Sequence, residues 1–213
     1  MKYVINKQKL YSIALLSAAM ILILVSIACT APYAYITNSG SNNVSVIDTA
    51  TNKVVTKVSV GINPYGVAVT PDGTKVYVTN EGNDNVSVID TINNTVTATV
   101  NGLNYPYGIA VTADGTKVYV ANKGNNTVSI IDTTTNTISA TVDVGSNPFG
   151  IAATPGVTNV YVTNSNAGVV TVINTTSNAV TATVSGLYGP SGVALTPDGS
   201  TVYVANQTAI LSL

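Results

Sequence analysis

The sequence predicts an all-β fold, a β-propeller built from four-stranded blades, and three observations support this prediction. The first is a strict repeat of 42 residues, whose copies open with the phrases YITN, YVTN, YVAN, YVTN and YVAN at Tyr35, Tyr77, Tyr119, Tyr161 and Tyr203. The second is a composition rich in Val, Ile, Thr and Asn with only 8% charged residues, which favours strands joined by polar turns. The third is that one repeat holds four short strand patterns, as a propeller blade does.

The repeat of residues 66–107 shows how each blade begins. Residues 67–70 form a nearly all-apolar run, so we expect an inner strand that is buried on both faces. Pro71-Asp72-Gly73 predicts a tight turn, because proline fixes the first corner and glycine supplies a left-handed residue. Residues 75–79 are the expected second strand, which contains the repeated tyrosine.

Two further strands complete the predicted blade. A wholly polar loop at 80–85 leads into a third strand at 86–89. A turn at 90–94 follows, and it begins with an aspartate whose carboxylate can accept backbone N–H groups. The fourth strand, at 95–100, alternates strictly between polar and apolar residues, as expected of an outer strand with one wet face. Residues 101–108 then return the chain to the next inner strand.

The residues that recur in successive copies are best explained by structural roles. We expect the repeated tyrosines to pack between neighbouring blades, the alternative being a ladder that faces a ligand. Asp48, Asp90 and Asp132 recur at the same turn, so we expect them to cap it and not to work as a catalytic acid and base. Asp84 is the one loop carboxylate that invites a Ca²⁺ site, and the ordinary polarity of a loop explains it better.

Four phrases recur along the chain: Asn63-Pro64-Tyr65-Gly66, Thr70-Pro71-Asp72-Gly73, Tyr77-Val78-Thr79-Asn80 and Val86-Ser87-Val88-Ile89-Asp90. Together they resemble the YVTN-type β-propeller repeat family, which is found in surface-layer and other exported proteins. The resemblance extends from residue 34 to about residue 206. It implies a propeller scaffold in an exported protein, and it leaves the activity open because such scaffolds carry many roles.

Two copies depart from the repeated pattern. Val157 stands where the type repeat has Gly73, and a β-branched residue is ill suited to positive φ, so the turn must differ in type there. In the same copy Asn174 replaces the turn aspartate. The connection Gly189-Pro190-Ser191-Gly192 lacks the aromatic residue that follows proline in the other copies.

The number of strands raises the question of whether the ring closes. Four inner strands are predicted, starting near Val67, Ile109, Ile151 and Val193, whereas the second strand occurs both at Tyr35 and at Tyr203. The chain can therefore close tightly on four blades, or it can stay open as an arc of four to five partly incomplete blades. We favour the open arc, because the copies keep the same twist whether or not the ring closes and the blades of the family that the chain resembles are built for rings of more units. Its end faces would be covered by self-association or by a partner, because an open arc leaves apolar faces in water.

The first thirty residues form a separate segment from the repeats at 31–213. Lys2, Lys7 and Lys9 precede the uncharged run at 10–28, which predicts a signal peptide or an N-terminal membrane anchor. The sequence Ser26-Ile27-Ala28-Cys29 resembles a lipoprotein cleavage box, so Cys29 is the candidate for lipid modification, with simple cleavage and a retained anchor as the alternatives. All three place the repeats outside the cytoplasm.

Composition argues against several classes of function. There is no histidine, so a Ser–His or Cys–His catalytic pair is excluded, and the acids are spread too thinly to suggest a metal site or a cofactor. Without the three lysines of the N-terminal segment, five lysines face nine acids, a net charge of about −4 that suits nucleic acid poorly. We therefore expect a non-catalytic scaffold or binding module at the cell surface. The alternatives are a propeller enzyme of the lyase or hydrolase type and a fragment of a longer surface protein.

The connections between blades are the best candidates for a binding site. Each brings an amide and an aromatic ring to the start of an inner strand near the channel mouth, namely Asn63 and Tyr65, Asn104 and Tyr107, and Asn147 and Phe149. This pairing suits a glycan or the edge of a protein partner, and the alternative is that the rings merely fill the channel. Glycosylation sequons on predicted loops begin at Asn43, Asn85, Asn93 and Asn125, and two others begin at Asn174 and Asn206.

Overall fold

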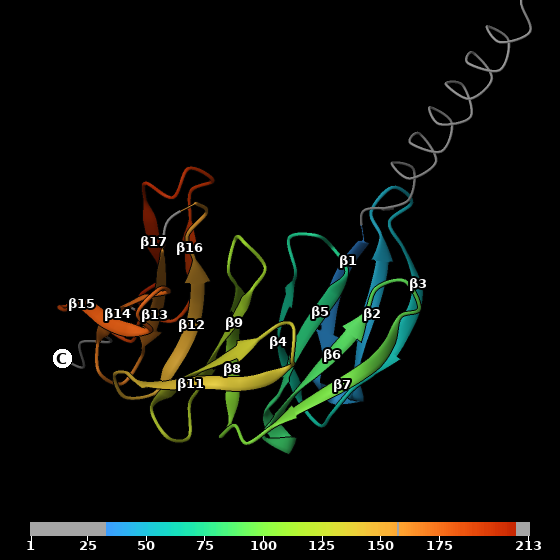
Figure 1. Ribbon diagram of the computed structural model, residues 1–213, viewed down its shortest axis with the longest axis horizontal. Helices are drawn as coiled ribbons and strands as arrows, with labels where there is room; N and C mark the ends of the chain where they lie inside the picture. Colours follow the sequence, from blue (N-terminus) through green and yellow to red (C-terminus); the bar gives the residue numbers. More distant parts are fainter. Residues whose placement is uncertain (1–32, 157, 208–213) are drawn as a thin grey trace, which may run out of the picture.

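The computed structural model describes residues 33–156 and 158–207, which form 17 strands in five antiparallel sheets (Figure 1). Within each sheet, strands that are hydrogen-bonded neighbours are also consecutive in the sequence. This is the meander of a propeller blade. The predicted all-β propeller with partly incomplete blades is confirmed.

Each sheet corresponds to one repeat unit, and we number the blades along the chain. Blade 1 holds β1 (Tyr33–Asn38), β2 (Asn43–Asp48) and β3 (Lys53–Ser59), and blade 2 holds β4 (Pro64–Val69), β5 (Lys75–Asn80), β6 (Asn85–Asp90) and β7 (Thr95–Asn101). Blade 3 holds β8 (Pro106–Val111), β9 (Lys117–Asn122), β10 (Thr127–Asp132) and β11 (Thr137–Asp143). Blade 4 holds β12 (Pro148–Ala153), β13 (Asn159–Asn164), β14 (Val169–Asn174) and β15 (Ala179–Val184), and a half-blade holds β16 (Val193–Leu195) and β17 (Val202–Val204).

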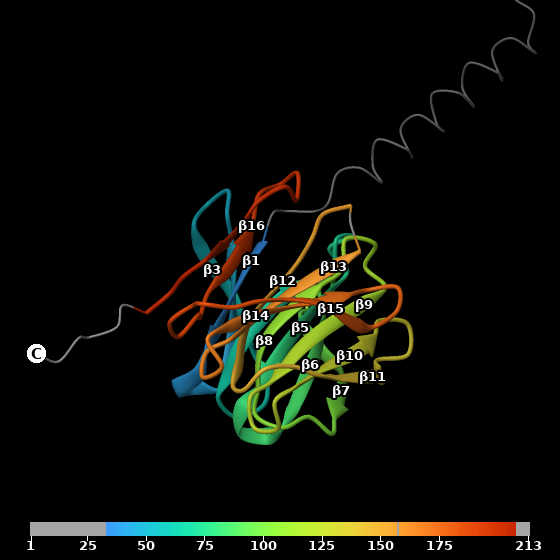
Figure 2. The same ribbon diagram turned by 90° about the vertical axis from the view of Figure 1, so that its left-hand side faces the viewer.

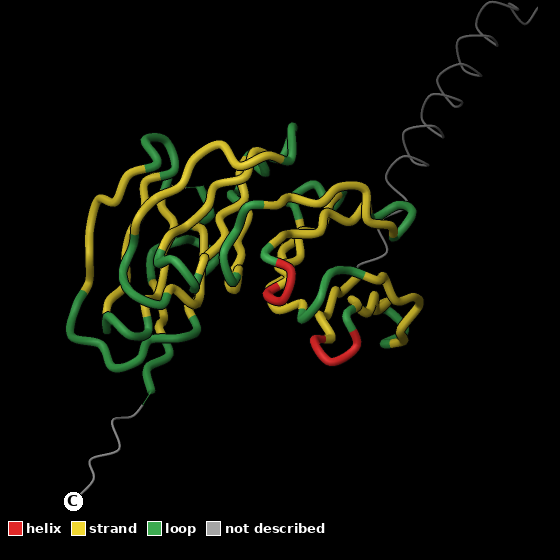
Figure 3. Tube along the Cα trace, turned by 90° about the horizontal axis from the view of Figure 1, so that it is seen from below, coloured by secondary structure: helices red, strands yellow, loops and turns green. Residues whose placement is uncertain are grey.

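The blades follow one another around an arc that does not close. Blade 1 lies at one end of the row in Figure 1 and the half-blade at the other, and β1 and β16 belong to separate sheets. Turned by 90° the sheets overlap in projection, as blades packed face to face should (Figure 2). From below, the trace shows the same open curve (Figure 3). The prediction of an open arc is therefore confirmed.

The turn between the first two strands of a blade has the predicted conformation. Gly73, Gly115 and Gly199 have φ near +70°, the left-handed region that glycine adopts without strain. In the fourth copy the left-handed residue is Gly156, with φ of 71°, so the turn shifts by one residue relative to the sequence alignment of the repeats. Residue 157 itself lies outside the described residues.

The turn between the third and fourth strands is capped as predicted. The Oδ1 atom of Asp90 accepts the backbone N–H groups of Ile92 and Asn93, each at 3.0 Å. Asn174 makes the same two contacts in the fourth copy, because its amide oxygen can replace a carboxylate oxygen as an acceptor. Each of these turns also contains an asparagine in the left-handed region, with φ between 53° and 55° at Asn52, Asn94, Asn136 and Asn178.

The expected burial of the inner strands is wrong. We expected residues 67–70 to be buried on both faces, but Val67 and Ala68 are half-buried, Val69 is 42% exposed and only Thr70 is buried. The open arc explains the difference, because the inner strands line its concave side and no opposite blade covers them. The second and third strands form the core instead, and β5 is buried at five of its six positions.

Three of the five repeated tyrosines, Tyr35, Tyr77 and Tyr119, are buried between neighbouring blades, which confirms the predicted packing role for them, whereas Tyr161 is half-buried and Tyr203 is 64% exposed. Tyr77 and Tyr119 are fully buried. The Tyr77 hydroxyl donates to Oδ1 of Asn136 in the following blade at 2.8 Å, and Tyr119 reaches Asn178 at 3.3 Å. Between blades 1 and 2 the corresponding Tyr35 hydroxyl and Asn94 amide oxygen are buried without a hydrogen-bond partner. Blades 2 and 3 therefore each reach forward to the following blade through a tyrosine hydroxyl.

Candidate functional site

Three aromatic rings form a row along the concave side of the arc. They stand at the same position of β4, β8 and β12, so the stacking of the blades brings them together. The ring centroids of Tyr65 and Tyr107 are 3.5 Å apart and nearly parallel, and those of Tyr107 and Phe149 are 4.4 Å apart. Tyr65 is 43% exposed, whereas the other two rings are half-buried. We call these three residues the aromatic row.

Charged groups border the aromatic row. The ammonium group of Lys123 lies 4.6 Å from the Tyr107 ring centre and 5.6 Å from that of Phe149, within the range of cation–π attraction. Burial raises the pKa of Tyr107, and a hydrogen bond to Tyr65 together with the Glu81 carboxylate raise it further. Tyr107 therefore stays neutral at any physiological pH, and the row has both a cation and an anion close by.

The backbone allows the rings to stack because the residue after each ring is glycine. A Cβ atom on Gly66 would lie 2.4 Å from the carbonyl oxygen of Tyr107, and one on Gly108 would lie 2.2 Å from that of Phe149. These distances are shorter than any normal contact, so only glycine permits the inner strands to approach so closely. The glycines thus fix the spacing of the aromatic row.

A threonine on the second strand holds the same carbonyl groups. The Thr79 hydroxyl donates to the Tyr107 carbonyl at 2.8 Å and accepts the Gly66 N–H at 2.7 Å. Thr163 makes the equivalent pair of contacts between blade 4 and the half-blade. The corresponding residue in blade 3 is Ala121, which has no hydroxyl. The contact between blades 3 and 4 therefore lacks this clamp.

Two of the three predicted asparagines, Asn63 and Asn147, use their side-chain amides within the loops. The Asn63 amide donates to the Glu81 carboxylate, and the Asn147 amide donates to the Ser165 hydroxyl at 2.6 Å. Both residues are in the left-handed conformation. In the connection between blades 2 and 3 the corresponding position is occupied by Tyr105, with φ of 47°. Asn104 is thus offset by one residue from the pattern. The structure brings the predicted aromatic residues together and engages Asn63 and Asn147 in the loops.

The four candidate glycosylation sites differ in their surroundings. Asn93 and Asn125 are exposed in turns, as predicted. The placement of Asn43 and Asn85 in loops is wrong, because they are the first residues of β2 and β6 and are half-buried. Their Oδ1 atoms accept hydrogen bonds from Asn38 and Asn80. Cys29 and the segment 1–30 lie outside the described residues.

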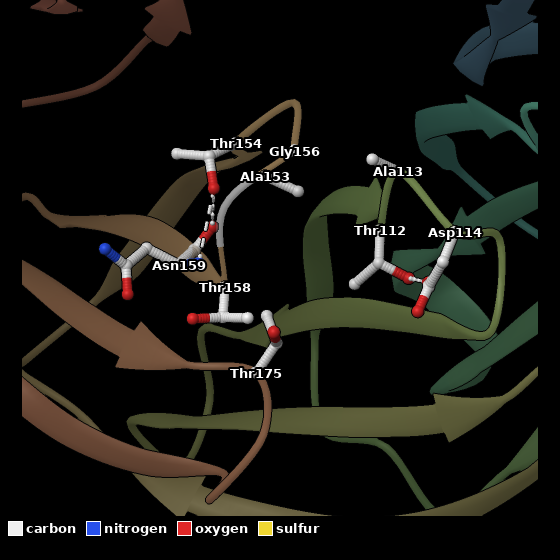
Figure 4. Close-up of a pocket in the computed structure, with 9 residues that line it drawn as sticks. All are labelled: Thr112, Ala113, Asp114, Ala153, Thr154, Gly156, Thr158, Asn159 and Thr175. Carbon is white, nitrogen blue, oxygen red and sulfur yellow. Dashed lines mark hydrogen bonds between the residues drawn. The ribbon is translucent and has the colours of Figure 1, made fainter. Parts of the chain in front are cut away.

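A pocket lies on the side of the arc that carries the turns between the first and second strands of the blades (Figure 4). It has a volume of about 390 Å³ and lies between the turns of blades 3 and 4. Its polar groups already serve those turns, since the Thr112 hydroxyl donates to Asp114 at 2.6 Å. The same contact, with the Thr116 backbone N–H, lowers the pKa of Asp114. Because its hydrogen-bonding groups are engaged locally, we regard it as a weaker candidate.

Within residues 33–156 and 158–207, no three His, Cys, Asp or Glu side chains gather as a metal site would require. Asp84, the carboxylate that invited a Ca²⁺ site, accepts the Tyr105 backbone N–H at 2.7 Å and so supports a connection between blades. The same part of the chain contains no helix long and apolar enough to cross a membrane.

Repeated four-stranded blades, tyrosines that reach forward and an inner aromatic row define a β-propeller protein. The known families make this more specific, because the model of the YNCE-like beta-propeller family matches residues 9–122 and 109–211. The chain therefore belongs to that family. It is also 57% identical over 37 residues to the PE-PGRS family protein PE_PGRS18 of Mycobacterium tuberculosis (strain ATCC 25618 / H37Rv), a stretch that covers 17% of this chain and 8% of that protein.

Two solved structures show the same fold. A chain of the Kuenenia stuttgartiensis hydrazine synthase superimposes with a TM-score of 0.78 at 28% identity, over 84% of this chain and 53% of that chain. The dihydro-heme d1 dehydrogenase NirN, solved in complex with DHE, gives a TM-score of 0.69 at 16% identity, over 84% of this chain and 41% of NirN. The chain thus spans about half of these proteins or less, and the NirN likeness concerns the fold alone.

Proposed function

We propose that the chain is an exported, non-catalytic binding module of the YVTN repeat type, displayed at the cell surface, and that its ligand lies on the aromatic row. The stacking of Tyr65, Tyr107 and Phe149 is the observation that carries this proposal. The basic, then apolar, N-terminal segment supports export, and the sequence motifs support the repeat type.

The exposed surface of the row favours a glycan as the ligand. Tyr65 leaves 43% of its surface open to solvent, and its ring stacks face to face on the Tyr107 ring with 27° between the two ring planes. A flat aromatic surface suits the C–H face of a sugar ring, and nearby polar groups can bind its hydroxyls. Glu81 and Lys123 are such groups. A protein partner that inserts an apolar side chain is the other ligand that this surface would suit.

The contacts of Lys123 argue against a site for polyanions. Its ammonium group lies against two aromatic rings, and the position in blade 2 that corresponds to Lys123 is Glu81. A polyanion needs several cations in one place, whereas this region pairs one cation with one anion. The site therefore suits neutral or mixed-charge ligands.

The proposal is tested by titrating the full-length chain in mild detergent with short neutral and acidic oligosaccharides and following binding by calorimetry. Replacing Tyr65 with alanine should weaken binding about tenfold, because one aromatic contact contributes about 1–1.5 kcal/mol. Tyr188→Ala is the matched control, since Tyr188 is 68% exposed in the connection that precedes the half-blade.

Equal affinity in wild type and Tyr65→Ala would show that the ligand lies elsewhere. If no oligosaccharide binds while a peptide library yields a ligand that is lost in Tyr65→Ala, the aromatic row binds a protein partner. Turnover of any tested glycan by the purified chain would contradict the non-catalytic part of the proposal.

A further inference from the structure

One face of blade 1 exposes an apolar row that crosses all three strands. Ala34 is paired with Ile47, and Ile47 with Val54, so the three residues lie side by side across β1, β2 and β3. Ile36 lies next to them on β1. Ile36 is 49% exposed and Val54 is 53% exposed, which is unusual for such side chains on a sheet face. We call this surface the rear face of blade 1, because it points away from blade 2.

The positions of Ala34, Ile36 and Ile47 are buried in the other blades, whereas the position of Val54 is exposed in blades 2 and 4 too, at 38% in Val96 and 42% in Val180. In each of these other blades, two residues of the second strand and one of the third are fully inaccessible to solvent. They are Val76, Val78 and Ile89 in blade 2, Val118, Val120 and Ile131 in blade 3, and Val160, Val162 and Ile173 in blade 4. In every case the preceding blade covers them. The rear face of blade 1 has the same chemistry and has no preceding blade among the described residues.

The opposite kind of face is open on blade 4. In blade 2, Val100 of the outer strand is only 4% exposed, because it packs against blade 3. The corresponding Val184 of blade 4 is 51% exposed, and β15 is exposed at all six positions. The half-blade contacts β12 and β13 of blade 4, and Val170 and Val172 of β14 are buried as well, so β15 is the uncovered part of this side. Tyr203 of the half-blade is itself 64% exposed. We call this surface the forward face of blade 4.

The chain therefore shows both halves of an interface that it already forms three times within itself. We propose that a second copy of this chain supplies the missing neighbour, with the forward face of blade 4 packed on the rear face of blade 1 of the other copy. An interface between two different faces propagates from copy to copy, and it ends only when the ring closes. Two such contacts related by a two-fold axis close the ring.

Strand pairing defines how the two copies meet. In blade 2 the inner strand pairs with the second strand through Val67 and Val78 and through Val69 and Val76. The same register pairs β16 with β1 of the second copy, so that Val193 lies opposite Ile36 and Leu195 opposite Ala34. In this arrangement β1, with six residues, replaces the three-residue strand β17 beside β16. Blade 1 then has all four strands.

A tyrosine contact completes the junction. Tyr77 and Tyr119 each donate to the left-handed asparagine of the following blade. In the proposed dimer the blade that follows Tyr161 is blade 1 of the second copy, and its left-handed asparagine is Asn52. Asn52 has φ of 55°, as its three counterparts do, and it is exposed in this structure. Tyr161, which is half-buried, would gain the partner that its position in the repeat predicts.

The count of blades favours a dimer. Each copy contributes three complete blades and one blade shared with its neighbour. Two copies therefore make a ring of eight blades, within the usual range of about 4–8, whereas three copies would exceed that range.

The first test measures the mass of the full-length chain in mild detergent by light scattering at micromolar concentration. We expect twice the 21.7 kDa of one chain for the wild type and a single chain for Ile36→Lys, because the lysine would be buried in the junction. Ile92→Lys is the matched control, since Ile92 is 83% exposed on an outer turn and lies on neither face. This variant should remain a dimer. The monomeric mass of Ile36→Lys under the same conditions would then show that neither the detergent nor the N-terminal segment causes the association.

The second test uses cysteines in a Cys29→Ser background. When a chain carrying Ala34→Cys is mixed with a chain carrying Leu195→Cys, oxidation should link the two chains, and neither variant alone should form this link. A register control replaces Ala34→Cys by Thr37→Cys, which would lie away from residue 195 and should link poorly.

Three outcomes would overturn the proposal. A wild-type chain that remains monomeric would show that a second copy does not cover these faces. A disulfide within one chain of the Ala34→Cys, Leu195→Cys double variant, with monomeric mass, would show that the chain closes on itself. Longer open-ended oligomers would show that the faces bind each other without closing a ring of eight blades.

Discussion

Replacing Gly108 with alanine tests whether the close approach of the inner strands holds the blades together. The added Cβ atom would lie 2.2 Å from the Phe149 carbonyl oxygen and 3.2 Å from both the Gly150 Cα atom and the Ile151 nitrogen. All three atoms belong to the backbone of the neighbouring strand, so no side chain can move aside and blades 3 and 4 must separate. Overpacking of a core costs about 1–3 kcal/mol, and we expect about 3 kcal/mol here because the obstacle is rigid.

Gly192 is the matched control for this substitution. It occupies the same position in the half-blade, and a Cβ atom there would meet nothing closer than the Ala205 Cβ atom at 3.8 Å. Gly192→Ala should be neutral or stabilise the protein by up to about 1 kcal/mol, because alanine restricts the unfolded chain. Both variants are compared in the Ile36→Lys background, which keeps the chain monomeric.

Urea unfolding of the full-length chain, followed by circular dichroism, measures both effects. The midpoint should fall for Gly108→Ala and stay constant or rise for Gly192→Ala. Equal changes in the two variants would refute the argument that contact between inner strands, and not glycine content as such, stabilises the array.

Three other predictions concern the same contacts. Ala121→Thr should raise the free energy of unfolding by about 1 kcal/mol, since the hydroxyl can bind the Gly108 N–H and the Phe149 carbonyl as Thr79 does in blade 2, and Ala205→Thr in the half-blade should have no effect. Tyr119→Ala should cost about 3–5 kcal/mol in chemical denaturation and Asp114→Ala about 1 kcal/mol, and the reverse ranking would contradict the core role of the tyrosine. Burial raises the pKa of Tyr77 and of Tyr119 to about 12, so the stability that these two phenols contribute should be constant below pH 10 and fall between pH 10 and about 12, because the unfolded chain ionises first; a flat alkaline unfolding profile would show that these phenols reach water.

The strands and turns could be predicted because each is set by local chemistry that recurs in every copy. The Pro-Asp-Gly turn, the capping aspartate and the alternating outer strand depend on a few adjacent residues, and Gly73 and Asp90 have the predicted roles. The burial of the inner strand depends on what lies across the arc, which no local pattern contains. Val69 therefore appeared fully buried in the sequence and is partly exposed in the structure.

The candidate site was predictable in its aromatic part only. Proline fixes the backbone before each ring, and the repeat places the rings of successive blades in one row. The asparagine side chains were not predictable, because their partners lie 18 residues away in loops whose sequences differ between copies. Tyr105 lies 42 residues after Asn63 and has the same left-handed backbone conformation, so the repeat period already shows that Tyr105, and not Asn104, corresponds to Asn63. Lys123 was also missed, because nothing in a lone lysine indicates that it lies over an aromatic ring.

The forward reach of the repeated tyrosines also governs how the chain acquires its structure. Tyr77 and Asn136 are 59 residues apart in the sequence, and Tyr119 and Asn178 are separated by the same number. Each contact closes a loop of constant length, so its entropic cost does not grow as blades are added. During synthesis, each blade can be locked as soon as the outer turn of the following blade emerges. Pairing β1 with β16 inside one chain would instead enclose every intervening blade in a single loop, which makes it the slowest contact of the array to form.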